Sequence, residues 1–158
     1  MNSQYPENLF INNRPKLPIC ELKDEDILYH SFSKDEMDDN GDIEVNSIRF
    51  PDFSCNWAKF SKPEDLKYRE NGQPLDGCYA FTIEVAKFCN FALVVHDPIY
   101  DLIFPNYAHV EVRTLQTTDP VDKPDFEPPK NQKKPSKSNR LTYRKNLVSQ
   151  KVIVSMPY

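Results

Sequence analysis

Glycine is scarce in this sequence: Gly41, Gly72 and Gly77 are the only three among 158 residues. Their spacing excludes the glycine-rich loop that cradles phosphate groups in many nucleotide-binding proteins. Proline, in contrast, occurs 14 times. Because proline fixes one backbone angle and carries no N–H group, we expect stiff, extended connections between short elements.

Long apolar runs are missing as well. A membrane-spanning helix needs about 18 or more apolar residues in a row, and the chain has no such run. The first residues, MNSQYPENLF, do not combine a basic patch with an apolar stretch, so they do not resemble a secretory signal. We therefore expect a cytoplasmic protein that does not contact a membrane.

The cysteines form no C-x-x-C pair, which argues against a zinc ribbon or a thioredoxin-like redox site. In a reducing compartment they are expected as free thiols, and buried ones as ordinary core residues. The four cysteines are Cys20, Cys55, Cys78 and Cys89.

Acidic residues are absent after Glu127. All 24 lie at or before that position, whereas 8 of the 20 Lys and Arg residues lie between Lys130 and Lys151. Residues 1–129 thus carry −12 (12 − 24) and the remainder +8. This asymmetry favours self-association, or contact of the basic part with an anion or a protein partner, although such lysines also occur in plain solvated linkers. The residues expected to make that contact are Lys130, Lys133, Lys134, Lys137, Arg140, Arg144 and Lys145.

Short apolar segments between turn residues predict an α+β fold, with a small mixed or antiparallel sheet and two or three short helices. Strands are predicted over residues 27–32, 43–50, 91–96, 107–112 and 151–155, with a strand that runs into a short helix over 78–90. The 91–96 strand is apolar nearly throughout and is expected to be buried on both faces.

A helix start is predicted at Ser61-Lys62-Pro63-Glu64, which has the pattern of a capping box. We expect this helix to cover residues 63–69 and to end before Asn71-Gly72. Residues 141–150 predict one or two further helical turns.

Composition divides the chain into four parts. Residues 1–23 are expected to form an extended, disordered-like N-terminal arm, and residues 24–118 a compact α+β domain. Residues 119–140 are rich in Pro and Lys and are expected to form a linker. Residues 141–158 are β-capable at their end, so they either return to the core sheet or add a strand to the sheet of a partner.

Polar residues able to do chemistry gather at three places: Tyr29-His30-Ser31, Arg49 with Ser54, Asn56 and Trp57, and His96-Asp97 with His109 and Glu111. Histidine titrates near neutral pH and serves as acid, base or ligand. Two histidines and a carboxylate could bind a metal, but His96 and His109 flank a proline-framed loop. The sequence therefore predicts no metal site and no cofactor.

Each candidate also has a purely structural interpretation. His96-Asp97-Pro98 fits a turn that closes a strand. His109 and Glu111 share a strand face that either lines a cleft or is the solvated side of an edge strand. Trp57 fits a core position, and Ser54 has no base beside it in the sequence.

The order of several short motifs resembles a small uncharacterised bacterial protein family over about residues 26–113. The matching residues are Leu28-Tyr29-His30, Asn46-Ser47 to Phe50, Ser54, Ser61-Lys62-Pro63-Glu64, His96-Asp97-Pro98 and Asn106-Tyr107-Ala108-His109. In that family an LYR strand precedes an SSAAF segment, an aliphatic strand ends before DP, and N-P-A-H opens the next strand. This chain departs from the pattern at His30 and Tyr107, where the family tends to have Arg and Pro. The resemblance implies a compact domain and no particular activity.

Three functions remain open. The first is a small intracellular bacterial protein-interaction or accessory domain, in a multi-protein system such as a defence or toxin-linked operon. It is favoured by the lack of a catalytic motif, the charge asymmetry and the β-capable C-terminus.

The second is a compact enzyme that transfers ADP-ribose or cuts RNA, with a cleft around His30, Ser54, His109 and Glu111. The early LYH motif and the late Glu111 are similar to the arrangement in ADP-ribosyltransferase-like folds. That similarity implies that His30 binds a nicotinamide dinucleotide, Ser54 supports it and Glu111 polarises the ribose. The third function is a nucleic-acid binder that uses the basic residues 130–145, where aromatic residues for base stacking are nearly absent.

Overall fold

The computed structural model describes residues 10–11, 14–15, 21–66, 77–99, 106–123 and 126–157. Its strands are β1 (Phe10–Ile11), β2 (Arg14–Pro15), β3 (Ile27–Phe32), β4 (Phe53–Trp57), β5 (Gly77–Thr82), β6 (Ala92–His96), β7 (His109–Thr114) and β8 (Val152–Ser155). Its helices are the 3₁₀ turns η2 (Lys34–Glu36), η3 (Val45–Ser47) and η4 (Pro63–Leu66), the one-turn helix α1 (Ile83–Ala86) and the long helix α2 (Lys137–Gln150).

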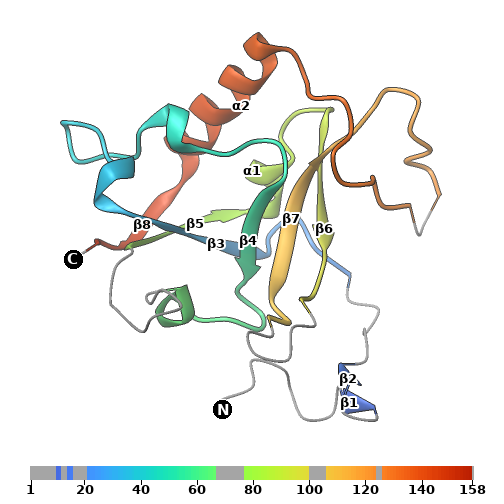
Figure 1. Cartoon of the computed structure of the whole chain (residues 1–158), viewed down its shortest axis with the longest axis horizontal. Helices are drawn as coiled ribbons and strands as arrows, with labels where there is room; N and C mark the ends of the chain where they lie inside the picture. The colour runs from blue at the N-terminus through green and yellow to red at the C-terminus, as the bar shows by residue number, and fades with distance from the viewer. Residues whose placement is uncertain are drawn as a thin grey trace.

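Six strands form one antiparallel sheet in the order β6-β7-β4-β3-β5-β8. The central strands β3 and β4 share only two register pairs, Leu28↔Trp57 and Tyr29↔Asn56. Beyond these pairs the two strands part. Figure 1 shows the result: β4, β7 and β6 run upright, whereas β3, β5 and β8 run across them. The sheet therefore has two three-strand halves that join at the β3–β4 contact.

The core lies on one face of this sheet, where β4 contributes Phe53, Cys55 and Trp57. Helix α2 packs there through Tyr143, which is stacked on Phe50 with ring centroids 3.9 Å apart. The Tyr143 hydroxyl donates to the carbonyl of Ala86 at 2.6 Å, which ties α2 to α1. Because a buried hydroxyl is costly to leave unpaired, this bond fixes where α2 docks.

The antiparallel sheet with few helices confirms the α+β prediction. The predicted strand over 27–32 is β3, and the predicted strand-to-helix segment is β5 followed by α1. The strand predicted over 91–96 is β6. It lies at one end of the sheet. Ala92 and Val94 are buried on one face and Val95 on the other, whereas Leu93 and His96 are half-buried, so both faces are covered in part.

The strand predicted over 43–50 is wrong. Residues 45–47 form η3, and Ile43 makes only an isolated bridge to Met37. The alternation there was partial, and α2 decides the conformation instead: Arg144 Nε donates to the Ile48 carbonyl at 2.8 Å. A long-range contact thus overrides a weak local pattern.

The helix predicted over 63–69 is a 3₁₀ turn in its described part, and residues 67–76, including Asn71-Gly72, lie outside the described residues. Its cap also differs from the predicted capping box. The Lys62 backbone N–H donates to Asp65 Oδ2 at 2.8 Å, so Asp65 rather than Glu64 satisfies the turn.

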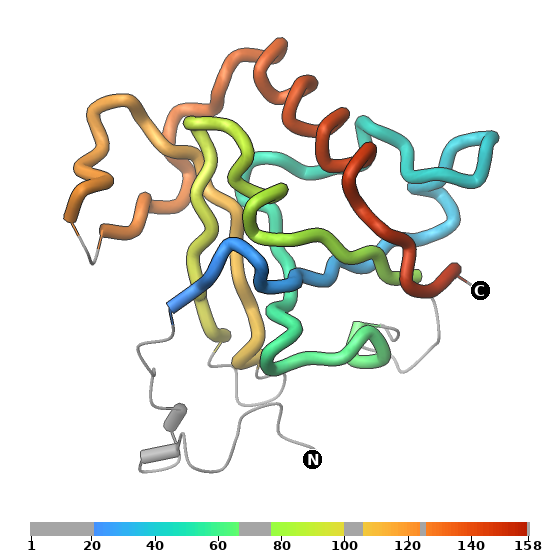
Figure 2. Tube along the Cα trace, turned by 180° about the vertical axis from the view of Figure 1, so that it is seen from behind, coloured from blue at the N-terminus to red at the C-terminus, as the bar shows by residue number. Residues whose placement is uncertain are grey.

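The C-terminal part of the chain is packed against the domain. Residues 119–123 and 126–136 contain no helix or strand, yet Pro128 is buried. Helix α2 leads directly into β8, which pairs with β5 in the core sheet (Figure 2). In the N-terminal arm, the described pairs 10–11 and 14–15 form a small antiparallel ladder, and most of the predicted arm lies outside the described residues. Within the described part of the chain, no helix has the length and apolar character needed to cross a membrane.

Candidate active site

A cluster of polar side chains lies on the sheet face opposite the core, where β4 and β7 pair. The register pairs Ser54 with Glu111 and Asn56 with His109. Since side chains at paired antiparallel positions point to the same face, these four residues share one surface. Strand β7 lies between β6 and β4, and His109 and Glu111 are only 7% and 5% exposed. They are therefore not the solvated side of an edge strand.

Ser54, which has no base beside it in the sequence, has one in space. Its exposed hydroxyl lies 3.2 Å from His109 Nε2. The other ring nitrogen, Nδ1, lies 2.6 Å from the backbone carbonyl of Asp97. A carbonyl oxygen can only accept, so Nδ1 carries the proton, and in the neutral ring Nε2 can accept from the Ser54 hydroxyl. The order is nucleophile, base and orienting group, which is the arrangement that activates a hydroxyl.

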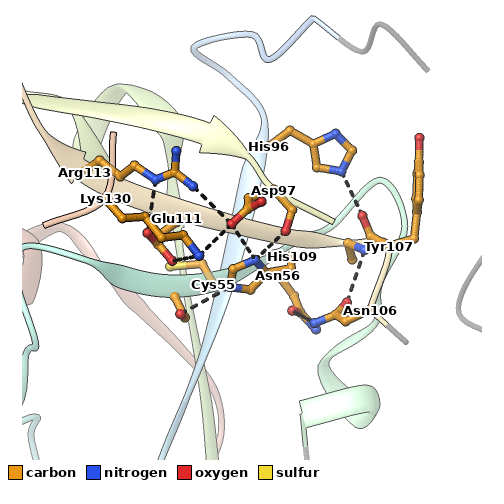
Figure 3. A network of polar contacts seen from close by, with 12 residues as sticks. Cys55, Asn56, His96, Asp97, Asn106, Tyr107, His109, Glu111, Arg113 and Lys130 are labelled. Atoms are coloured by element: carbon orange, nitrogen blue, oxygen red, sulfur yellow. Dashed lines mark hydrogen bonds and ion pairs between the residues drawn. The ribbon is translucent and has the colours of Figure 1, made fainter. Parts of the chain in front are cut away.

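Next to this pair, two acids and two bases form a closed network (Figure 3). Arg113 donates through Nε to Glu111 Oε1 at 3.1 Å and through Nη2 to Asp97 Oδ2 at 3.0 Å. The Lys130 ammonium lies 3.0 Å from Asp97 Oδ2 and 3.6 Å from Glu111 Oε2. Two carboxylates and two cations leave the network with no net charge. This pairing offsets the cost of burying the Glu111 carboxylate.

Asp97 is the residue that joins the two groups. Burial disfavours its charged form, but Lys130, Arg113 and His109 outweigh burial and hold the pKa of its carboxyl below the ordinary value. The hydrogen bond with Asp97 is in turn the main cause that raises the pKa of Lys130. Both groups are thus ionised at neutral pH.

His30 lies at the point where β3 and β4 part. Its Nδ1 donates to the backbone carbonyl of Ser54 at 2.6 Å. Its ring packs against Phe53 and Tyr79, with centroids 4.3 and 5.3 Å away. Burial lowers the pKa of His30 below its ordinary value, so the ring is neutral at pH 7. Strand alternation directs His30 toward the core side of the sheet, so it borders the β4–β7 cluster and does not lie within it.

Asn56 and Asn106 close the other end of the cluster. Asn106 Nδ2 donates to Asn56 Oδ1 at 2.8 Å, and Asn106 Oδ1 accepts from the Ala108 backbone N–H at 3.1 Å. Asn106 thereby fixes the turn that leads into β7 and so sets the position of His109. This is the physical role of the asparagine in the Asn106-Tyr107-Ala108-His109 motif.

His96 and Trp57, also singled out in the sequence, lie outside the cluster. His96 Nε2 donates to the Tyr107 carbonyl at 2.8 Å, and its ring packs among Trp57 and Phe60. Trp57 is 1% exposed and belongs to the core. Both residues belong to the packing that supports the site.

The predicted basic contact residues divide into two groups. Lys130 and Arg144 make contacts inside the fold, Lys130 with the carboxylates and Arg144 with the carbonyls of Ile48 and Phe50. The others lie at the surface or half-buried: Lys133, Lys134, Lys137, Arg140 and Lys145. Contact of this second group with an anion or nucleic acid stays a prediction.

The sequence interpretation grouped Asp97 with His109 and Glu111, but it missed Arg113 as part of the cluster. Arg113 could have been found, because it continues the alternation of His109 and Glu111 on the same strand face. For Asp97, the Asp-Pro signal also predicted a turn, which left its role open. Among the described residues, no group of three or more His, Cys, Asp or Glu side chains is arranged to hold a metal ion.

Known proteins give no further guide to the site. No family model matches the chain, and neither curated proteins nor solved structures show a significant match to it.

Proposed function

We propose that the chain is an enzyme of ADP-ribosyl transfer, which cleaves the bond between nicotinamide and ribose in a nicotinamide dinucleotide. The observation that carries this proposal is the order β7-β4-β3 in the centre of the sheet. These three strands are far apart in the sequence, and they carry Glu111, Ser54 and His30 respectively. The similarity to ADP-ribosyltransferase-like folds implies a His or Arg on an opening strand and a Glu on a late strand, as His30 and Glu111 are here. Ser54 and Glu111 share one face of the sheet, whereas His30 faces the core.

Glu111 is the candidate for stabilising the transition state. Breaking the C1′–N bond leaves the electron pair on the nicotinamide nitrogen and builds positive charge at the ribose C1′. An ionised carboxylate fixed beside C1′ stabilises that charge. Arg113 holds Glu111 Oε1 at 3.1 Å and so keeps the carboxylate oriented.

The Ser54–His109 pair is the candidate for handling the proton. An acceptor hydroxyl or water attacks C1′, and its proton passes to His109 Nε2, directly or through the Ser54 hydroxyl. Asp97 orients His109 through its carbonyl at 2.6 Å. His30 holds the Ser54 backbone in place from the core side of the sheet, through the bond from its Nδ1 at 2.6 Å. It therefore positions Ser54 and does not contact the substrate.

The test is nicotinamide release from nicotinamide adenine dinucleotide by the wild type and by Glu111→Gln. The substitution keeps the size and the hydrogen-bond acceptor but removes the charge, so the rate should fall about 100-fold or more. Ser54→Ala, at an exposed position, should lower the rate by about 10-fold or more without affecting folding. Glu84→Gln, at an exposed carboxylate on α1, is the matched control. Equal rates for the wild type and Glu111→Gln would remove Glu111 from the mechanism.

A second candidate function, self-association or protein binding, is favoured by β8. This strand is the last in the sheet, and no described strand pairs with its outer edge. Val152 and Val154 are 65% and 46% exposed, and Met156 beyond them is also exposed. Natural edge strands usually carry charge or proline at such positions, so an uncharged apolar edge is suited to pairing with the same edge of a second copy.

Val152→Lys combined with Val154→Lys tests this function. Both side chains are exposed, so the melting temperature should change little. If β8 is the contact, sedimentation equilibrium should show self-association of the wild type that the double variant loses. A wild type that stays monomeric at high concentration, or a double variant that associates equally, would exclude β8 as a self-association edge.

A further inference from the structure

The segment that follows β7 in sequence returns over the candidate site. We call residues 126–130 the strap. Its Pro128 carbonyl accepts from Arg113 Nη1 at 3.1 Å, and Pro128 is itself buried. Lys130, at the end of the strap, directs its ammonium between Asp97 and Glu111 (Figure 3). The strap therefore touches the Glu111 carboxylate, which the proposed reaction uses, and the carboxylate of Asp97, whose carbonyl orients His109.

The backbone on both sides of Lys130 is restricted. Pro128 and Pro129 restrict the backbone before Lys130, which lowers the entropy lost when the lysine is held in place. After it, Asn131 has a φ of 61°, a left-handed conformation that asparagine tolerates well and that turns the chain. Gln132 Nε2 then donates to the Thr114 carbonyl at 3.3 Å and so joins the chain to the end of β7.

The ion pair of Lys130 with the two carboxylates is nonetheless weak. The Lys130 side chain is 52% exposed, whereas that of Glu111 is 7% exposed. An ion pair with one partner half in water contributes little, since solvent screens it and the lysine regains rotamer freedom when it leaves. Removal of the Lys130 ammonium would leave Glu111 Oε2 open while Arg113 still holds Oε1.

We propose that Lys130 is an autoinhibitory plug: its ammonium occupies the place beside Asp97 and Glu111 that a cationic group of the substrate takes. This inference rests on the proposed function, in which the positive charge of the oxidised nicotinamide ring and of the ribose C1′ meets Glu111. The lysine satisfies the two carboxylates in the resting protein, and the incoming cation replaces it. The tip of the strap at Lys130 is then the part that must move before the reaction.

The test uses a small cation, 1-methylnicotinamide, and its neutral counterpart nicotinamide. Their dissociation constants are measured by calorimetry for the wild type, Lys130→Gln and Lys134→Gln. Lys134 is also exposed, so its variant reports the loss of one positive charge without a change at the site. Lys130→Gln should bind the cation about 10-fold more tightly than the wild type does, because a competing charge at close range is gone. Lys134→Gln should bind it like the wild type, and the affinity for nicotinamide should change far less.

Equal affinity of the wild type and Lys130→Gln for the cation would overturn the plug, as would the same gain in both variants, which indicates only a general charge effect. Hydrogen exchange gives a second readout: the cation should speed exchange at the amides of residues 130–132 in the wild type. The plug and the reaction can fail separately. If Lys130→Gln binds the cation more tightly but neither protein releases nicotinamide, the plug is supported and the proposed reaction is excluded. If the wild type and Lys130→Gln release nicotinamide at equal rates and bind the cation equally, the reaction is supported and the plug is excluded.

Discussion

At the scale of single residues, Asp97 decides how the candidate site is built. Its carbonyl orients His109, and its carboxylate contacts Arg113 and Lys130. In the sequence it precedes a proline, and that signal predicts a turn. The turn prediction and the polar role are compatible, because a residue at the end of a strand can close the ladder with its backbone and reach sideways with its side chain.

Asp97→Asn should lower the free energy of unfolding by about 1 kcal/mol at pH 7, a figure kept small because the carboxylate is about one-third exposed and partly screened. The folded-state pKa lies below the unfolded value, so the carboxylate stabilises the fold above about pH 4. That contribution disappears as the pH falls through the lowered pKa. Urea unfolding from pH 7 to pH 3 should therefore show the two proteins converging in stability.

Asp39→Asn, at an exposed turn position, is the control for this series and should follow the wild type throughout. A difference between Asp97→Asn and the wild type that stays constant down to pH 3 would mean that the carboxylate charge contributes nothing to stability.

At the scale of elements, the strands with the clearest apolar patterns could be predicted from the sequence and the weaker ones could not. Strand β3 has the predicted bounds, whereas the partial alternation over 43–50 does not form a strand. The contact that shapes that region comes from α2, through Arg144 to the Ile48 carbonyl. Local periodicity carries no information about such a partner almost a hundred residues away.

Gly77 is the tightest point between β5 and β8. A Cβ added there would lie 2.5 Å from the Ser155 carbonyl oxygen and 2.6 Å from Phe32 Cζ. Gly77→Ala should therefore push β8 or the Phe32 ring aside and cost about 1–3 kcal/mol. Thermal unfolding should show a melting temperature lower by about 2–4 °C per kcal/mol.

Gly41→Asn is the matched control for that substitution. Gly41 has open space around it and a φ of 80°, which asparagine adopts more readily than other residues. Its melting temperature should stay close to that of the wild type. If Gly77→Ala were as stable as this control, the close approach of β5, β8 and Phe32 would be wrong.

At the scale of the whole molecule, the sheet order matters more than any local pattern. His30, Ser54 and Glu111 could be singled out from the sequence by residue type, but their proximity could not, because β3, β4 and β7 become neighbours only through non-sequential pairing. The partnership of Ser54 with His109 depends on the same pairing, since 55 residues separate them. Strand register is set by tertiary packing, so a single sequence leaves it open.

The C-terminal part contributes to the core of the whole molecule, although the composition of its first residues suggests a linker. Tyr143 and Leu147 of α2 are buried in the core, and β8 completes the sheet. Removing everything after the proline-rich region would therefore remove part of the core. Tests of nucleic-acid binding accordingly call for charge substitutions at the exposed residues Lys133, Lys134, Lys137 and Lys145 and not for truncation.

The most direct measurement is product analysis after incubation of the protein with nicotinamide adenine dinucleotide. Wild type and Lys130→Gln are compared, with the fold of each verified by circular dichroism. We predict that nicotinamide appears one for one with dinucleotide consumed, faster with Lys130→Gln and slower with Ser54→Ala. Intact dinucleotide with both folded proteins would contradict the assignment of ADP-ribosyl chemistry to the β4–β7 cluster.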